Sequence, residues 1–352
     1  MTMPEFQHPE ADERAVSGLA LPDDEQLDKT LRPAAFEDFV GQNEIKHNLR
    51  VYIEAAKKRG EPLDHVLLSG PPGLGKTTLA AIIAREMGAG FRTTSGPALE
   101  RPADLVGLLT GLEKGDVLFI DEVHRTGAVV EEYLYSAMDD FRIDIVIDKG
   151  VGARAVKMPL KPFTLVAATT REGLLTAPFR SRFGIPEKLA FYPPGDLARI
   201  IARSAEILGV EVDDEGATEL AGRARGTPRV ANRFLKRVRD VAEVEGEGTV
   251  TAKLARRGLA MLGVDERGLD RMDRQILEAV RKHGGGPVGL KTIAVTVGEE
   301  EDTIEEVYEP FLIQQGLIQK TPKGRCLSPA GVEVLGGDPG EAPPGQETLF
   351  NP

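Results

Sequence analysis

Residues 70–78 read GPPGLGKTT and match the phosphate-binding pattern G-x-x-x-x-G-K-[ST] in full. The stretch follows the apolar run HVLLS at 65–69 and precedes the helix-forming segment TTLAAIIAREM at 77–87. A strand, a glycine-rich turn and a helix in this order surround phosphate oxygens with backbone N–H groups and the positive end of a helix dipole. A glycine-rich turn can match by chance, but here pattern and context agree. The stretch predicts an α/β nucleotide-binding domain.

The same pattern assigns expected roles to single residues. Lys76 is expected to bridge the β- and γ-phosphates of ATP, and the Thr77 hydroxyl to ligate Mg²⁺. Gly73, Gly75 and Thr78 complete the predicted cradle for the nucleotide.

An acidic pair follows the next continuous apolar run. Residues 117–120 read VLFI, as expected of a buried parallel strand, and end in Asp121 and Glu122. Such a pair alone is more often solvated than catalytic, but this one follows a complete phosphate-binding motif. Asp121 is expected to hold Mg²⁺, and Glu122 to orient or deprotonate the attacking water.

The pattern of elements divides the chain into five predicted parts. Apolar runs at 65–70, 116–121 and 163–170 alternate with helical segments, which is typical of a parallel sheet. After Pro194 helices are expected at 196–208, 214–225, 227–243 and 249–262, then at 269–283, 289–297 and 299–315, followed by two short strands. The expected parts are an acidic disordered tail (1–29), a large ATPase domain with a parallel sheet (30–192), a small all-α lid (193–264), a winged helix (265–335) and a flexible tail (336–352).

Composition excludes several classes of protein. The single cysteine, Cys326, excludes an internal disulfide and a cysteine-rich zinc site. The sequence contains no apolar run of about 18 residues, so no membrane span is predicted. The first residues lack the apolar region of a secretory signal. We therefore expect a soluble, cytosolic protein.

The net charge of −12 argues at first against a nucleic-acid partner. However, residues 1–40 hold ten acids against three bases, and residues 331–352 hold four acids and no base. The predicted third helix of the winged helix, 299–315, carries seven acids, which we interpret as a solvated face that does not enter a DNA groove. The predicted wing, 319–325, carries Lys320, Lys323 and Arg325 and no acid. It is expected to contact DNA phosphates without reading sequence; the alternative is an ordinary basic surface turn.

Further motifs resemble a known family. The segments DEVHR (121–125), ATTR (168–171) and APFRSRFG (177–184) resemble those of AAA+ ATPases. Together with LRP (31–33), FVGQ (39–42) and GTPRVANR (226–233), they resemble the RuvB family of Holliday-junction branch-migration motors. The resemblance covers about residues 30–330. It implies ATP-driven DNA translocation in recombination and repair, including the SOS response to DNA damage, in the bacterial cytoplasm.

The resemblance also implies roles for single residues. Thr169 matches sensor 1, Arg229 matches sensor 2, and Arg182 matches an arginine finger that acts on the neighbouring subunit. Arg180 is the competing finger candidate. Leu31, Arg32 and Tyr192 match positions that hold the adenine and ribose end of the nucleotide. Asp139, Asp140 and Phe141 match positions near the nucleotide of an adjacent subunit. Tyr192 can equally be an aromatic that packs at a hinge.

The resemblance further implies partners. Residues 143–157 alternate β-branched side chains around Gly150 and Gly152, which indicates a hairpin; in the family it docks on RuvA, and the alternative is an ordinary edge hairpin. A homo-hexameric ring, Holliday-junction and duplex DNA, and RuvC in the resolving complex are also implied. Lys320 and Arg325 match DNA-contact positions, although the family usually has Arg where Lys320 stands.

Other functions stay open on the sequence alone. A clamp-loader or adaptor ATPase would share single motifs, but such subunits often carry a cysteine zinc module. A transcriptional regulator would bind one DNA sequence tightly. Residues 346–350 (QETLF) resemble peptides that bind bacterial sliding clamps; the alternative is an inert tail.

Overall fold

The computed structural model describes residues 16, 24–146, 155–246 and 248–338. The chain forms two compact units. The sheet unit comprises Arg32–Gly70 and Leu74–Ala190, and the helical unit comprises Met1–Leu31, Pro71–Gly73 and Phe191–Pro352. In the described part of the chain, no helix is both long and apolar enough to cross a bilayer.

The sheet unit is built on five parallel strands in the order β2-β3-β6-β1-β7. The strands are β1 (Val66–Ser69), β2 (Phe91–Ser95), β3 (Val117–Asp121), β6 (Thr164–Thr169) and β7 (Ile185–Lys188). The strands β1 and β6 are buried throughout, as the apolar runs at 65–70 and 163–170 predict. The predicted α/β fold with a parallel sheet is confirmed.

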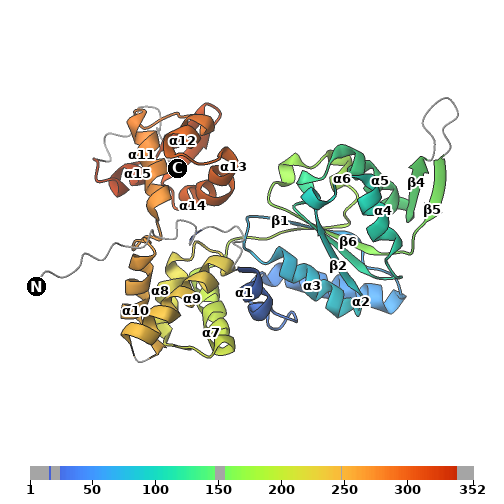
Figure 1. Ribbon diagram of the computed structural model, residues 1–352, viewed down its shortest axis with the longest axis horizontal. Coiled ribbons are helices and arrows are strands. Elements are labelled where there is room, and N and C mark those ends of the chain that lie inside the picture. Colours follow the sequence, from blue (N-terminus) through green and yellow to red (C-terminus); the bar gives the residue numbers. More distant parts are fainter. Residues whose placement is uncertain (1–15, 17–23, 147–154, 247, 339–352) are drawn as a thin grey trace, which may run out of the picture. The chain divides into compact units, whose positions relative to one another are not determined.

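Helices cover both faces of this sheet (Figure 1). On one face lie α2 (Asn43–Arg59) and α3 (Lys76–Met87), and on the other α4 (Pro102–Thr110), α5 (Ala128–Asp140) and α6 (Ala177–Arg180). Because strand side chains alternate between faces, Leu118 and Ile120 of β3 join the core beneath α4, α5 and α6. Three short turns of 3₁₀ helix connect these elements: η1 (Gly96–Ala98), η2 (Val123–Arg125) and η3 (Glu172–Leu174).

A separate hairpin extends from the sheet unit. Its strands β4 (Arg142–Val146) and β5 (Ala155–Pro159) pair antiparallel, with Arg142 opposite Pro159. This agrees with the hairpin predicted over 143–157, whose turn at 147–154 lies outside the described residues.

The helical unit contains a helical bundle. Its helices are α1 (Asp24–Leu31), α7 (Pro194–Leu208), α8 (Asp214–Arg223), α9 (Pro228–Glu245) and α10 (Ala252–Met261). Two short strands, β8 (Glu211–Val212) and β9 (Thr249–Val250), pair in parallel between them. The helix expected from residue 249 therefore begins later, at Ala252, where the Thr251 side chain caps it.

The same unit ends in a winged helix. Its elements are α11 (Arg271–Lys282), α12 (Leu290–Val297), α13 (Glu301–Thr303), η4 (Ile304–Tyr308), α14 (Glu309–Gln314), β10 (Ile318–Thr321), β11 (Gly324–Leu327) and α15 (Pro329–Val334). The expected third helix, 299–315, is interrupted by the π turn η4. Pro310 has no N–H to donate to the preceding turn, so the regular α-helical bonding cannot run through it. The antiparallel pair β10–β11 forms the predicted wing.

Candidate functional site

The loop after β1 adopts a conformation that requires glycine. Gly70 has φ 137°, and an added Cβ would lie 2.7 Å from the carbonyl oxygen of Leu189. Gly75, with φ 95°, stands at the start of α3, where an added Cβ would meet the ring of Phe39 at 3.2 Å. Gly73 also has a positive φ, 79°. These glycines let the backbone turn sharply between strand and helix, as a phosphate cradle needs.

Lys76 and Thr77 begin helix α3, and their side chains reach the ends of β1 and β3. Lys76 is 6% exposed, and its Nζ donates to the carbonyl oxygen of Gly70 at 2.7 Å. The Thr77 hydroxyl lies 3.5 Å from the Asp121 carboxylate. Two hard oxygen donors from neighbouring elements suit Mg²⁺, which keeps several waters and takes few protein ligands. The residues present therefore fit the predicted metal.

Glu122 is held at the end of β3 by two neighbours that the sequence interpretation did not include. The hydroxyl of Thr170 donates to its carboxylate at 3.0 Å, and His124 Nδ1 lies 3.2 Å from the same oxygen. His124 Nδ1 is also 2.9 Å from the Thr169 hydroxyl. Burial lowers the pKa of His124, so at neutral pH its imidazole is uncharged and can donate one hydrogen bond. The acid and the sensor-1 candidate thus share one hydrogen-bonded cluster.

Thr170→Val is expected to lower the turnover number for ATP about tenfold and to change KM little. A hydrogen bond to a charged group is worth about 1.5–3 kcal/mol, and here it orients the carboxylate that is expected to act on water. Steady-state phosphate release measures both constants. Thr93→Val, an exposed threonine on β2, is the matched control. An unchanged turnover number in Thr170→Val would remove Thr170 from the site.

Arg182 lies just after α6, against the outer face of α5. Its guanidinium forms an ion pair with Asp139 at 2.8 Å, donates to the carbonyl oxygen of Pro178 at 2.6 Å, and lies 4.2 Å from the ring centroid of Tyr135. Its side chain is 23% exposed. Arg180, the competing candidate, is exposed. The structure thus brings Arg182 and Asp139 together, although they are far apart in sequence.

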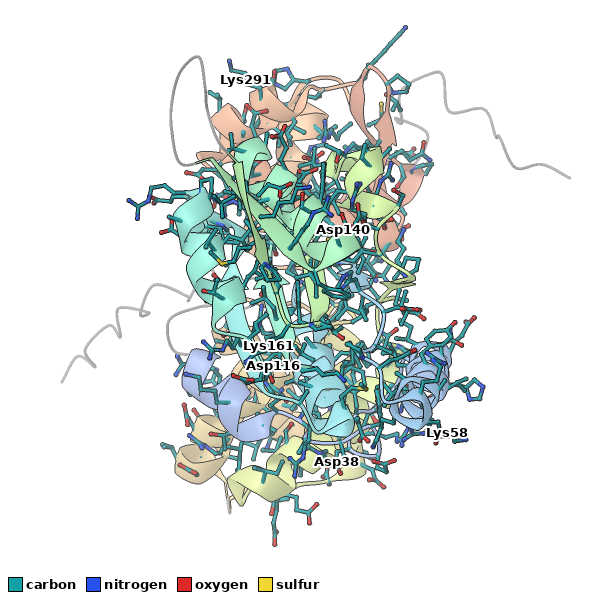
Figure 2. All side chains as sticks on the ribbon, turned by 90° about the vertical axis from the view of Figure 1, so that its right-hand side faces the viewer. Asp38, Lys58, Asp116, Asp140, Lys161 and Lys291 are labelled. Carbon is teal, nitrogen blue, oxygen red and sulfur yellow. The ribbon has the colours of Figure 1, made fainter. Side chains whose placement is uncertain are left out.

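The other two residues of the 139–141 segment have different surroundings. Asp140, labelled in Figure 2, is exposed and pairs with Arg142 at 2.9 Å. Phe141 follows α5 as its C-cap with φ 48° and packs edge-on against Phe163, with ring centroids 5.9 Å apart. Phe141 therefore packs against the edge of the core, and the two acids stand at the surface.

The predicted adenine and ribose contacts divide between the two units. In the sheet unit, Nε of Arg32 is buried without a hydrogen-bond partner among the described residues. In the helical unit, Leu31 and Tyr192 are buried, which agrees with the packing interpretation of Tyr192. The backbone N–H of Tyr192 donates to Gly226, and that of Arg229 donates to Gly73 at 3.4 Å. The start of α9 therefore contacts Gly73, a residue of its own unit, through the backbone.

Two of the three wing cations, Lys320 and Arg325, are already paired within the winged helix. Arg325 donates to Glu309 at 2.5 and 3.2 Å, and their side chains are 12% and 4% exposed. Lys320 bonds Glu305 at 2.8 Å and Glu309 at 3.2 Å, and the bond to Glu305 raises the lysine pKa. Lys323, at the turn, is exposed.

This pairing corrects one prediction from the sequence. The acids of the third helix were expected to form a solvated face, and Glu300, Glu301 and Asp302 are indeed exposed. Glu309 is buried instead, because it balances the charge of Arg325 beneath the wing. At least one of the seven acids, Glu309, therefore stabilises the fold by pairing with Arg325 and does not belong to a solvated face.

Comparisons with known proteins agree with these observations. Three family models match consecutive segments: the Holliday junction DNA helicase RuvB P-loop domain at 31–189, the RuvB AAA lid domain at 192–265, and the RuvB C-terminal winged helix domain at 266–336. The Holliday junction branch migration complex subunit RuvB of Myxococcus xanthus is 57% identical over 326 residues, covering 92% of this chain and 95% of its own. The subunit of the same name from Salinibacter ruber is 61% identical over 303 residues, covering 86% and 88%.

A solved structure agrees at the level of the fold. The Thermotoga maritima RuvB Holliday junction branch migration motor matches with a TM-score of 0.81 and 47% identity, over 88% of this chain and 99% of that one. The family models span the parallel sheet, the helical bundle and the winged helix described above. The chain belongs to the RuvB family, and it is an AAA+ ATPase of the helicase class.

Proposed function

We propose that this chain is the ATP-driven motor of Holliday-junction branch migration, acting as a homo-hexameric ring on DNA together with RuvA. The observation that carries the proposal is the cluster at the ends of β1, β3 and β6. There Lys76 donates to Gly70, the Thr77 hydroxyl lies beside the Asp121 carboxylate, and Glu122 follows Asp121 directly. The proposal also rests on the names of the relatives, which describe branch-migration subunits.

Each residue of the cluster has a proposed step. Lys76 binds the β- and γ-phosphates. Thr77 and Asp121 would hold Mg²⁺, which would supply positive charge beside the phosphates. Glu122, oriented by Thr170 and His124, positions or deprotonates the attacking water. Thr169 contacts the γ-phosphate or that water from the neighbouring strand end, and Thr78 contacts the phosphates beside Thr77.

Other residues act from outside this cluster. Arg182 completes the site of an adjacent subunit, and Asp139, its partner in the isolated chain, would lie at the same subunit boundary with Asp140 and Phe141. Arg229 senses the nucleotide from helix α9, and Leu31, Arg32 and Tyr192 hold its adenine and ribose end. The hairpin β4–β5 docks on RuvA, and RuvC joins in the resolving complex.

Lys323→Ala is expected to weaken DNA binding equally on all sequences. The wing is proposed to contact phosphates, and Lys323 is its exposed cation at the turn, whereas Lys320 and Arg325 must exchange their glutamate partners for phosphate. Loss of one phosphate contact lowers the slope of log affinity against log salt by about 0.9. Gel shifts over a range of salt concentrations, with duplex and four-way junction DNA, measure that slope.

The matched control is Lys253→Ala, an exposed lysine on α10 outside the winged helix. The proposed role of Lys323 fails if Lys323→Ala and Lys253→Ala give the same salt slope as the parent chain. Tight binding of a single DNA sequence by the parent chain would favour a transcriptional regulator instead.

A further inference from the structure

A buried cluster of charge joins the loop before α9 to the winged helix, within the helical unit. Arg225 is 5% exposed and lies between α8 and α9 with φ 55°. Its guanidinium donates to both carboxylate oxygens of Asp273, and its Nε donates to the carbonyl oxygen of Gly268 at 3.2 Å. The carboxylate of Asp270 lies 3.6 Å away. One arginine of the bundle thus engages three residues at the start of the winged helix.

The cluster is closed by apolar and backbone contacts. The guanidinium of Arg225 lies 4.6 Å from the ring centroid of Phe311, on α14. Asp270 and Asp273 cap α11 reciprocally, since each side chain accepts the backbone N–H of the other. Arg225 is therefore bonded to the first turn of one helix of the winged helix and stacked on another.

The charges in this cluster are strongly desolvated. Asp270 is 6% exposed and Asp273 is fully buried. Burial raises the pKa of Asp273, and the Arg225 guanidinium beside it opposes this rise by favouring the charged carboxylate. Burial also raises the pKa of Tyr308, which lies in the electrostatic reach of the two carboxylates. Such a cluster keeps its geometry, because losing one partner leaves a buried charge uncompensated.

The loop that carries Arg225 also continues into the nucleotide-sensing end of α9. Gly226 accepts a hydrogen bond from Tyr192, and Arg229, the second residue of α9, donates its backbone N–H to Gly73 of the phosphate loop. Pro71 and Pro72 line one small crevice together with Arg225, Thr227 and Phe311. Within the helical unit, Pro71–Gly73 of the phosphate loop, the start of α9 and the winged helix therefore meet around residues 225–229.

We propose that Arg225 is a positioning residue that ties the start of α9 to the winged helix, so that nucleotide binding at Arg229 is transmitted to the DNA-binding end of the chain. This inference rests on the proposed roles of Arg229 and of the wing. A short loop with a buried, bidentate ion pair transmits displacement better than a flexible linker, because bidentate geometry fixes both distance and orientation.

The first test uses nucleotide alone. Amide hydrogen exchange of α11 (Arg271–Lys282) is measured in the full chain with and without a slowly hydrolysed ATP analogue. The parent chain is expected to show a nucleotide-dependent change in α11, and Arg225→Met to show none while binding the analogue with a Kd within about threefold of the parent. No change in the parent, or the same change in both chains, would overturn the inference.

The matched control is Arg223→Met. Arg223 is also a buried arginine at the end of α8, but it pairs with Glu219 inside the bundle. It is expected to keep the parent response, so an equal loss in both variants would mean general loosening and would contradict the inference. Arg225→Lys keeps the charge without the bidentate fork and is expected to respond at an intermediate level. If Arg225→Met does not fold, Arg225→Lys decides in its place: a full parent response in it would overturn the inference.

A second readout separates this inference from the proposed function. The ratio of DNA-stimulated to basal ATP hydrolysis is expected to fall about fivefold or more in Arg225→Met, with basal turnover within about twofold of the parent. A parent chain that DNA does not stimulate would refute the proposed function, and the exchange measurement would still decide on Arg225. Equal stimulation of the parent and Arg225→Met would overturn the coupling.

Discussion

Arg182→Ala is expected to bind ATP as tightly as the parent chain and to hydrolyse it about 10³- to 10⁵-fold more slowly. An arginine finger stabilises charge on the transferred phosphoryl group in the transition state, so its loss lowers turnover and leaves ground-state binding intact. The position of Arg182 favours this role: it lies at the surface edge of α5 and α6, paired with Asp139 and stacked on Tyr135. Isothermal titration measures binding, and phosphate release measures turnover.

The proposed action of Arg182 on a neighbouring subunit has its own test. Arg182→Ala keeps an intact phosphate loop, and Lys76→Ala keeps an intact finger, so mixing the two inactive chains is expected to restore part of the turnover. Arg180→Ala, two residues away and exposed, is the matched control and is expected to remain active. Full activity of Arg182→Ala, or loss of activity only in Arg180→Ala, would contradict the assignment.

Glu122→Gln is expected to retain ATP binding and to lose turnover by about 10²- to 10⁴-fold. The amide preserves the shape of the side chain and its contact with Thr170, but it cannot accept a proton from water. Trapping of radiolabelled ATP and phosphate release together separate binding from hydrolysis.

Glu172→Gln is the control for Glu122→Gln, because Glu172 begins η3, close in sequence to the sensor-1 strand, and has no proposed role. Normal turnover in Glu122→Gln would show that another group activates the water. Loss of ATP binding would instead give Glu122 a structural role in the nucleotide site.

The sequence predicts the centre of the sheet unit better than its edges. The strands β1, β3 and β6 are continuous apolar runs because both faces are covered. Two of them end in predicted site residues, β3 in Asp121 and β6 in Thr169. The edge strands β2 and β7 escape this signal. They read FRTTS and IPEK and include exposed residues. The backbone N–H and C=O groups on the outer edge of such a strand can bond water, so the strand needs no continuous apolar run.

Contacts between distant residues were equally hard to predict. Glu309 and Arg325 lie on a helix and a strand, and only folding shows that one neutralises the other. Arg225 and Asp273 pair across 48 positions of sequence. Local patterns indicate elements and motifs, whereas the partner of a buried charge depends on which elements pack together. His124 and Thr170 lie inside the motifs DEVHR (121–125) and ATTR (168–171), but the motifs assigned them no role.

We propose above all that ATP hydrolysis by this chain powers movement on a four-way DNA junction, so the junction should stimulate hydrolysis. The most direct measurement is the rate of ATP hydrolysis with and without a RuvA-bound four-way junction, using linear duplex of the same length and composition as the comparison and Lys76→Ala as the blank. We expect the RuvA-bound junction to stimulate hydrolysis well above the rate with duplex, and Lys76→Ala to be inactive throughout. A rate that is the same with the junction, with duplex and without DNA would contradict the account.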